Sequence, residues 1–71
     1  MKFAAFKRTI ENATQTERQE ILSRHLRTGP DMIARHDAEH AHLLNADKVR
    51  KGLVRWNKMV NDLAFKYSVT A

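Results

Sequence analysis

Cysteine, proline, glycine and long hydrophobic runs are scarce in this sequence. Its 71 residues include no Cys, one Pro and two Gly. Without Cys no disulfide can stabilise the fold, and the default compartment is the reducing cytoplasm. The longest wholly apolar stretch, residues 3–6, is far shorter than the ~20 residues of a membrane span and shorter than the apolar core of a signal peptide. We therefore expect a cytoplasmic protein without a membrane partner.

The length of the chain limits both its architecture and its chemistry. We expect one domain, residues 1–71, which buries only about 60% of the surface that the unfolded chain exposes. An apolar content of 42% is too high for a disordered chain. Without disulfides, a domain of this size depends on close helix packing, a metal ion or a second copy of itself. An enzyme with a walled pocket and a separate substrate-binding lobe does not fit, so we predict a non-enzymatic protein.

The spacing of apolar residues predicts helices and no strands, because these residues recur every three or four positions. We predict an all-α fold, a small bundle of three to four helices completed by dimerisation. The expected helices cover residues 3–13, 15–27, 30–44 and 46–67. Thr14 and Glu17 have the spacing of a capping box, which marks the start of the second helix. Gly29 followed by Pro30 is typical of one helix ending and the next beginning.

The last predicted helix carries a regular apolar seam with steps of four and three residues. The seam consists of Val49, Leu53, Trp56, Val60, Leu63 and Tyr67. It can form the core of the bundle, or part of it can pack against a second subunit in a homodimer. The candidate interface residues are Leu53, Trp56, Val60 and Leu63. Gly52 costs about 1 kcal/mol in a helix relative to Ala, a cost that a close approach of another backbone would offset.

Positive charge is concentrated on the side of this helix opposite the seam. The chain has 13 Lys and Arg against 8 Asp and Glu, a net charge of +5. No acidic residue occurs between Lys48 and Lys58. Cations spaced by helical turns can contact successive phosphates of a nucleic acid. We predict a regulatory protein that binds the DNA or RNA backbone through Lys48, Arg50, Lys51, Arg55 and Lys58.

Two other interpretations of the basic helix stay open. Its charged face can be an ordinary solvated surface. It can also belong to a protein-interaction module or inhibitor that binds an acidic protein surface, as accessory proteins of phages or mobile elements do. The aromatic residues lie mostly on apolar faces of the predicted helices, so the sequence indicates no stacking platform for single strands.

Three histidines, His25, His36 and His40, lie on apolar faces of the predicted helices. They can be core residues, a pH-responsive interface, or ligands of zinc or another divalent metal, since His36 and His40 are one turn apart. No other cofactor is expected. Residues 36–40 also fit the H-x-x-E-H pattern of inverted zinc peptidases, but those domains are several times longer, so we infer no peptidase.

Overall fold

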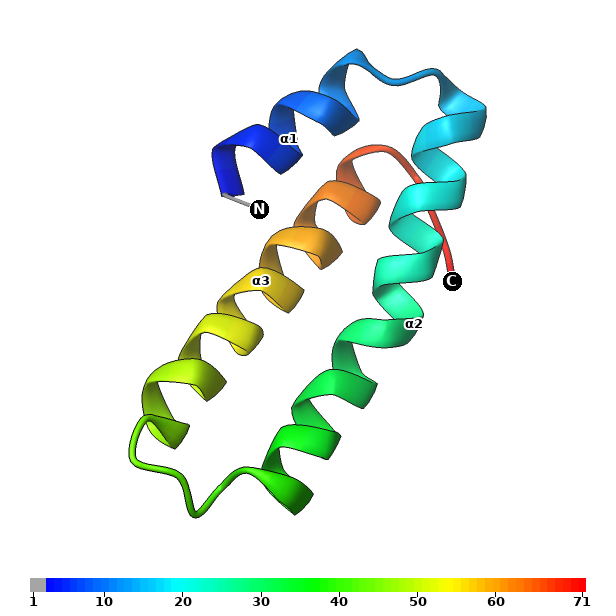
Figure 1. Cartoon of the computed structure of the whole chain (residues 1–71). Coiled ribbons are helices and arrows are strands. Elements are labelled where there is room, and N and C mark those ends of the chain that lie inside the picture. Colours follow the sequence, from blue (N-terminus) through cyan, green and yellow to red (C-terminus); the bar gives the residue numbers. More distant parts are fainter. Residues whose placement is uncertain (1–2) are drawn as a thin grey trace.

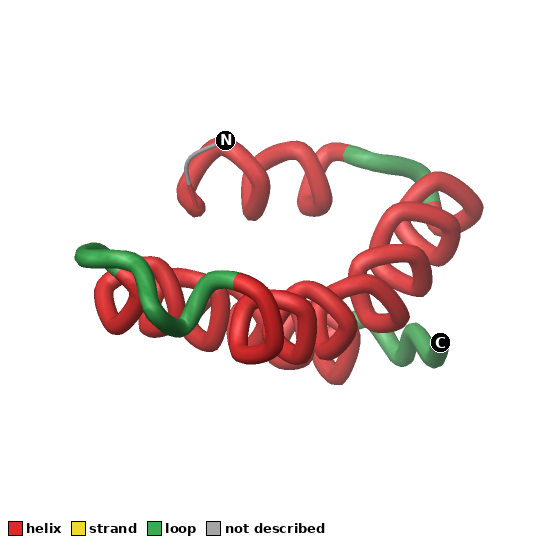
Figure 2. The backbone as a smooth tube through the Cα atoms, turned by 60° about the horizontal axis from the view of Figure 1, so that its bottom comes forward, coloured by secondary structure: helices red, strands yellow, loops and turns green. Residues whose placement is uncertain are grey.

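The computed structural model describes residues 3–71 as three α-helices and a short C-terminal tail. Helix α1 covers Phe3–Asn12, α2 covers Gln15–Glu39 and α3 covers Ala46–Lys66. Helices α2 and α3 form an antiparallel hairpin, and α1 lies against one half of it (Figure 1). Figure 2 shows α1 above the layer that α2 and α3 form. The prediction of an all-α bundle is confirmed, and no helix among the described residues is long and apolar enough to cross a membrane.

The structure has three helices, so the helix end predicted at Gly29 is wrong. The segments 15–27 and 30–44 belong largely to one helix, α2, which continues through Pro30. Gly29 does not have a positive φ and is not a helix cap. A Cβ atom at Gly29 would collide with the side-chain oxygen of Asn57, so this glycine lets α2 approach α3. The missing Cβ also relieves the clash that a proline ring makes with the preceding residue of a helix.

The other glycine, Gly52, has no close neighbour among residues 3–71 of the chain itself. Gly52 lies on an open side of α3, and no atom of a neighbouring element lies within 4 Å of the position that a Cβ would take. Half of the α2–α3 hairpin likewise has no helix of the described chain packed against it on this side.

The predicted helix over residues 30–44 ends earlier than expected, because α2 stops at Glu39. Residues 40–45 reverse the chain so that α3 can pack antiparallel to α2. The turn is held by backbone hydrogen bonds from Leu43 N to His40 O and from Ala46 N to Leu43 O, each 3.1 Å long. Leu43 and Leu44 consequently lie in an exposed turn.

The predicted capping box at the start of α2 is confirmed. The Thr14 side chain accepts a hydrogen bond from the Glu17 backbone at 3.2 Å, and Glu17 Oε1 accepts one from the Thr14 backbone at 2.9 Å. Hydrogen bonding of the Glu17 carboxylate to the backbone, and then to the side chain, of Thr14 lowers the pKa of Glu17. One turn later, the Arg18 guanidinium donates to Ile10 O at 2.9 Å and to Ala13 O at 3.0 Å. Arg18 therefore binds carbonyls at the end of α1, where Ile10 O also accepts from Ala13 N at 3.3 Å, and ties the start of α2 to α1.

The hydrophobic core lies at the end of the hairpin that α1 covers. It combines side chains of all three helices with one residue of the tail. Its members are Phe6, Ile10, Leu22, Met59, Val60, Leu63, Ala64 and Val69. The half of the hairpin that α1 covers is therefore the half that is closed to water.

Candidate nucleic-acid interface

The basic face of α3 consists of Lys48, Lys51, Arg55 and Lys58, all of which are exposed. Their spacing of three, four and three residues places them along one side of the helix. None of the four has an ion-pair partner among residues 3–71. Four positive charges on this side are therefore available to an anionic partner.

Arg50, which the sequence placed with these cations, points instead toward α2. Its Nε donates a hydrogen bond of 2.9 Å to Asp37 Oδ1 across the hairpin. The bond and the charge of Arg50 hold the pKa of Asp37 below its usual range. Since both side chains are about half exposed, this ion pair contributes little to stability. Arg50 is nevertheless less available to a phosphate than the four unpaired cations.

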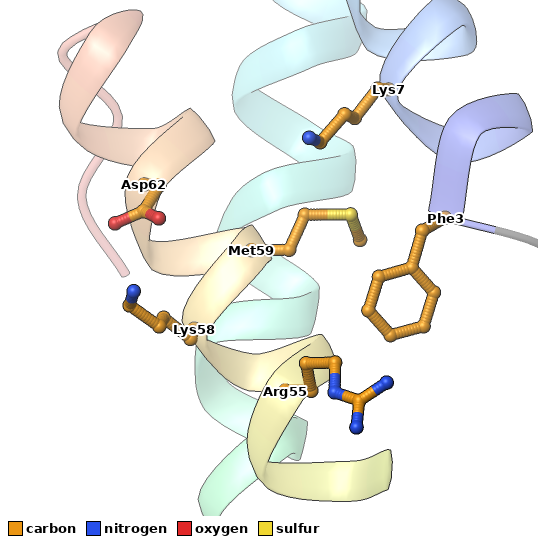
Figure 3. Close-up of a pocket in the computed structure, with 6 residues that line it drawn as sticks. All are labelled: Phe3, Lys7, Arg55, Lys58, Met59 and Asp62. Carbon is orange, nitrogen blue, oxygen red and sulfur yellow. The ribbon is translucent and has the colours of Figure 1, made fainter.

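A shallow pocket between α1 and α3 extends the basic face onto a second helix (Figure 3). It has a volume of about 230 Å³, and Lys7 of α1 joins Arg55 and Lys58 around it. Phe3 and Met59 supply apolar lining, and Asp62 is the one acidic residue at its edge. No pattern in the sequence groups Lys7 with α3, because only the packing of α1 brings them together.

The outer side of α3 also exposes apolar residues that the sequence analysis missed. Phe65 is 90% exposed and lies seven residues after Lys58, on the same side of the helix. Val54 is partly exposed in a hollow of about 330 Å³ that Lys51, Arg55 and other basic residues line. Most aromatic residues were expected on apolar faces, and Phe65 is an exposed exception that is free to stack on a base. Its position off the apolar seam of the helix was the signal in the sequence that could have identified it.

The candidate interface residues of the seam divide between the core and the surface. Val60 and Leu63 are buried in the core of the chain itself. Trp56 is half-buried, with its ring centroid 4.8 Å from that of Phe6 and 5.2 Å from that of Phe3. Leu53 is half-buried where α1 no longer covers the hairpin. Only the part of the seam before Trp56 remains open to a second subunit.

The three histidines do not converge on one site. Because α2 is continuous, His25 and His36 are eleven residues apart, about 16 Å along the helix axis. Residues 3–71 contain no group of three His, Asp or Glu side chains placed to hold a metal ion. His36 and His40 remain neighbours, with ring centroids 6.2 Å apart. The structure therefore does not bring together the proposed ligands His25, His36 and His40.

Each histidine has its own environment. The His25 ring packs against Phe6 and Trp56, and its burial, together with the charge of Arg24, lowers its pKa. His36 is only 5% exposed, and its Nδ1 has no hydrogen-bond partner; the nearest carboxylate oxygen, of Asp37, is 3.6 Å away. His25 and His36 are thus packed within the fold, as the core interpretation expected.

Comparison of this chain with protein-family models, with curated proteins and with solved structures finds no match.

Proposed function

We propose that the protein binds the phosphate backbone of DNA or RNA through the basic face of α3, as a homodimer and without catalysing a reaction. The observation that supports this most is a run of four exposed cations without an ion-pair partner, Lys48, Lys51, Arg55 and Lys58. A solvated helix face commonly carries both signs in pairs one turn apart. From Lys48 to Lys58 this face carries one sign over three turns, and Asp62 follows one turn later.

The spacing of the cations suits a polyanion. Successive charged residues are three or four positions apart, so their backbone positions are separated by about 4.5 to 6 Å along the helix. Lys7 of α1 adds a cation beside Arg55 and Lys58, which widens the face toward α1. Because the contacts are with phosphates, the proposal implies affinity that depends strongly on salt and weakly on base sequence.

Fluorescence anisotropy with labelled duplex DNA and single-stranded RNA, measured from about 50 mM to about 200 mM salt, tests the proposal. The variant Lys51→Gln/Arg55→Gln removes two phosphate contacts. We expect its affinity to fall at least tenfold at low salt. The slope of log affinity against log salt should decrease by about 1.8 for duplex DNA, since each contact contributes about 0.9.

The matched control is Arg24→Gln/Arg27→Gln, which lowers the net charge equally but changes α2. Arg24 and Arg27 are exposed, and Arg24 is already near Glu20. We expect the control to keep the salt slope of the unmodified chain. No binding at 50 mM salt, or equal losses in both double variants, would contradict binding through α3.

An acidic protein surface is the second candidate partner. Val54 favours it, because an apolar side chain within the basic hollow contributes nothing to phosphate binding and is common at protein interfaces. Affinity capture from a lysate, with and without nuclease, separates the two candidates. A captured protein that survives nuclease and disappears with Lys51→Glu/Arg55→Glu would support the protein surface, whereas loss on nuclease treatment alone supports nucleic acid.

A further inference from the structure

Half of the α2–α3 hairpin presents an apolar groove that no other part of the described chain covers. We call it the uncovered groove. It is lined by Met32 and His36 of α2, by His40 directly after that helix, and by Val49 and Leu53 of α3. Met32 is 53% exposed and Val49 is 49% exposed. The turn closes the groove at its far end with the exposed side chains of Leu43 and Leu44.

The uncovered groove is continuous with the groove that α1 occupies. Three adjoining hollows of about 450, 280 and 500 Å³ follow the hairpin, and all three have Val49 in their lining. The last of them reaches Phe3 and Trp56, where α1 begins. In the other half of the groove, α1 inserts the helically spaced side chains of Phe6 and Ile10 into the core. Apolar helical side chains are therefore what the groove accepts.

Helix α1 is too short to cover this half of the hairpin as well. Helix α1 has 10 residues, whereas α2 has 25 and α3 has 21. Every member of the core cluster lies at the α1 end or in the tail, and in the other half only His36 and Ala46 are buried. The radius of gyration of 13.2 Å exceeds the value of about 11 Å expected for a compact domain of this length. Half of the hairpin thus lacks a second layer, which helical domains need in order to bury an apolar face.

We propose that a second copy of this chain fills the uncovered groove, with the two hairpins packed face to face and antiparallel. Four helices, two from each copy, then enclose the side chains of Met32, Val49 and Leu53 as the core of a symmetric bundle. This inference identifies the interface of the homodimer in the proposed function. It does not depend on nucleic-acid binding.

The shape of the chain favours a second copy over an unrelated partner. One end is two layers thick because α1 lies on it, and the other is one layer thick (Figure 2). Antiparallel pairing brings the two thin halves together and leaves each α1 beyond the turn of the other copy. Parallel pairing of the same faces would instead set the two α1 helices against each other.

Charges at the edge of the groove are also compatible with antiparallel pairing. Arg35 and Glu39 are exposed and one turn apart on the same side of α2. When α2 lies antiparallel to its symmetry mate with the twofold axis at the level of Asp37, Arg35 of each copy faces Glu39 of the other. A parallel arrangement would instead set like charges opposite one another.

Sedimentation equilibrium of the nuclease-treated chain, from about 5 µM to about 500 µM, tests the proposal. The expected mass rises with concentration from 8.2 kDa toward twice that value. Because the interface is apolar, the dimer should persist in salt that abolishes nucleic-acid binding. A mass of 8.2 kDa at every concentration, or a larger mass only when another protein is present, would overturn the proposal.

Two variants locate the interface. Val49→Glu places a charge in the uncovered groove and should leave a monomer with unchanged helical circular dichroism. Phe65→Glu is the matched control, since Phe65 is 90% exposed on the other side of α3, and it should still dimerise. Equal dissociation of both variants, or a persistent dimer with Val49→Glu, would show that the groove is not the interface.

A charge exchange tests the antiparallel arrangement even if Val49→Glu fails to fold. Arg35→Glu should weaken the dimer several-fold, because it places like charges opposite one another, and Arg35→Glu/Glu39→Arg should restore it. Failure of the double variant to recover the affinity would exclude the antiparallel packing of α2 on α2. Dimerisation without nucleic-acid binding would contradict the proposed nucleic-acid binding alone. Nucleic-acid binding by a strict monomer would contradict the proposed dimer alone.

Discussion

Gly29 of α2 and Asn57 of α3 lie so close together that a methyl group on Gly29 would overlap the Asn57 side chain. Asn57 Oδ1 is buried there without a hydrogen-bond partner. A buried acceptor without a hydrogen-bond partner lowers the free energy of unfolding by about 1 to 3 kcal/mol. The contact between Gly29 and Asn57 therefore fixes how the helices fit together at some cost in stability. The glycine therefore sets the separation of the two long helices.

We expect Gly29→Ala to be destabilising, because Asn57 must rotate and because alanine before a proline is unfavourable in a helix. In an Asn57→Ala background the cost of Gly29→Ala should be smaller by about 1 kcal/mol, a typical coupling for residues in contact. The penalty from the proline is the same in both backgrounds and cancels. Urea denaturation of the four variants measures the coupling, and additive effects would contradict the contact.

The matched control for this glycine is Gly52→Ala. No neighbouring element lies within 4 Å of a Cβ at Gly52. The substitution should therefore stabilise the chain by about 0.5 to 1 kcal/mol through helix propensity alone. Denaturation is measured at low concentration so that self-association does not contribute. A loss of stability would show that the open side of α3 is occupied within the monomer.

Ser68 offers a second route to higher stability. It has a positive φ of 56° directly after α3, and the hydrogen bonds from Ser68 N to Phe65 O and from Val69 N to Ala64 O close a Schellman motif. Ser68→Gly should raise the free energy of unfolding by about 1 kcal/mol, because glycine adopts this conformation without steric cost. Thermal denaturation measures the gain. An unchanged or lower midpoint would mean that the tail does not hold this conformation in solution.

The free energy of unfolding should decrease on acidification, in the pH range in which His25 becomes protonated. Burial, followed by the charge of Arg24, lowers the pKa of His25 in the folded chain below its unfolded value of about 6.5. The unfolded state then binds more protons, so this contribution to stability is complete above pH 6.5 and decreases as the pH falls through the folded pKa. His25→Gln should give a shallower loss between pH 7.5 and pH 5 in urea titrations.

His42→Gln is the control for this experiment, because His42 is exposed in the turn between α2 and α3. It should retain the pH dependence of the unmodified chain. Equal slopes for the His25 variant and the unmodified chain would show that another group causes the loss.

If the protein binds nucleic acid as proposed, Phe65 should contribute to the affinity for single strands and not to the affinity for duplexes. An aromatic ring that is 90% exposed near Lys58 and Lys66 can stack on an unpaired base, a contact that contributes about 1 to 3 kcal/mol. Phe65→Ala should weaken binding to single-stranded RNA about tenfold and leave duplex binding unchanged. Val54→Ala, which removes a partly exposed apolar side chain from the same side of α3, is the control. Equal losses for both ligands would contradict stacking.

The local features of the sequence were sufficient for the helices and their polar faces. Apolar spacing indicated α1 and α3 to within a residue or two, and the capping box at Thr14 marked the start of α2. The exposed basic face of α3 could also be predicted, because charges on a helix follow from its periodicity alone. These features depend on residues one or two turns apart, and so they can be read without knowing what packs against the helix.

Contacts between helices decided the rest. The pair Gly29 and Pro30 has the sequence of a helix boundary, yet α2 continues through it, and the missing side chain at Gly29 instead makes room for Asn57 of α3. The same continuity separates His25 from His36, and the packing of α1 brings Lys7 to the basic face. Tertiary packing overrides local preference at such points, since neighbours distant in the sequence determine which conformation is lowest in free energy.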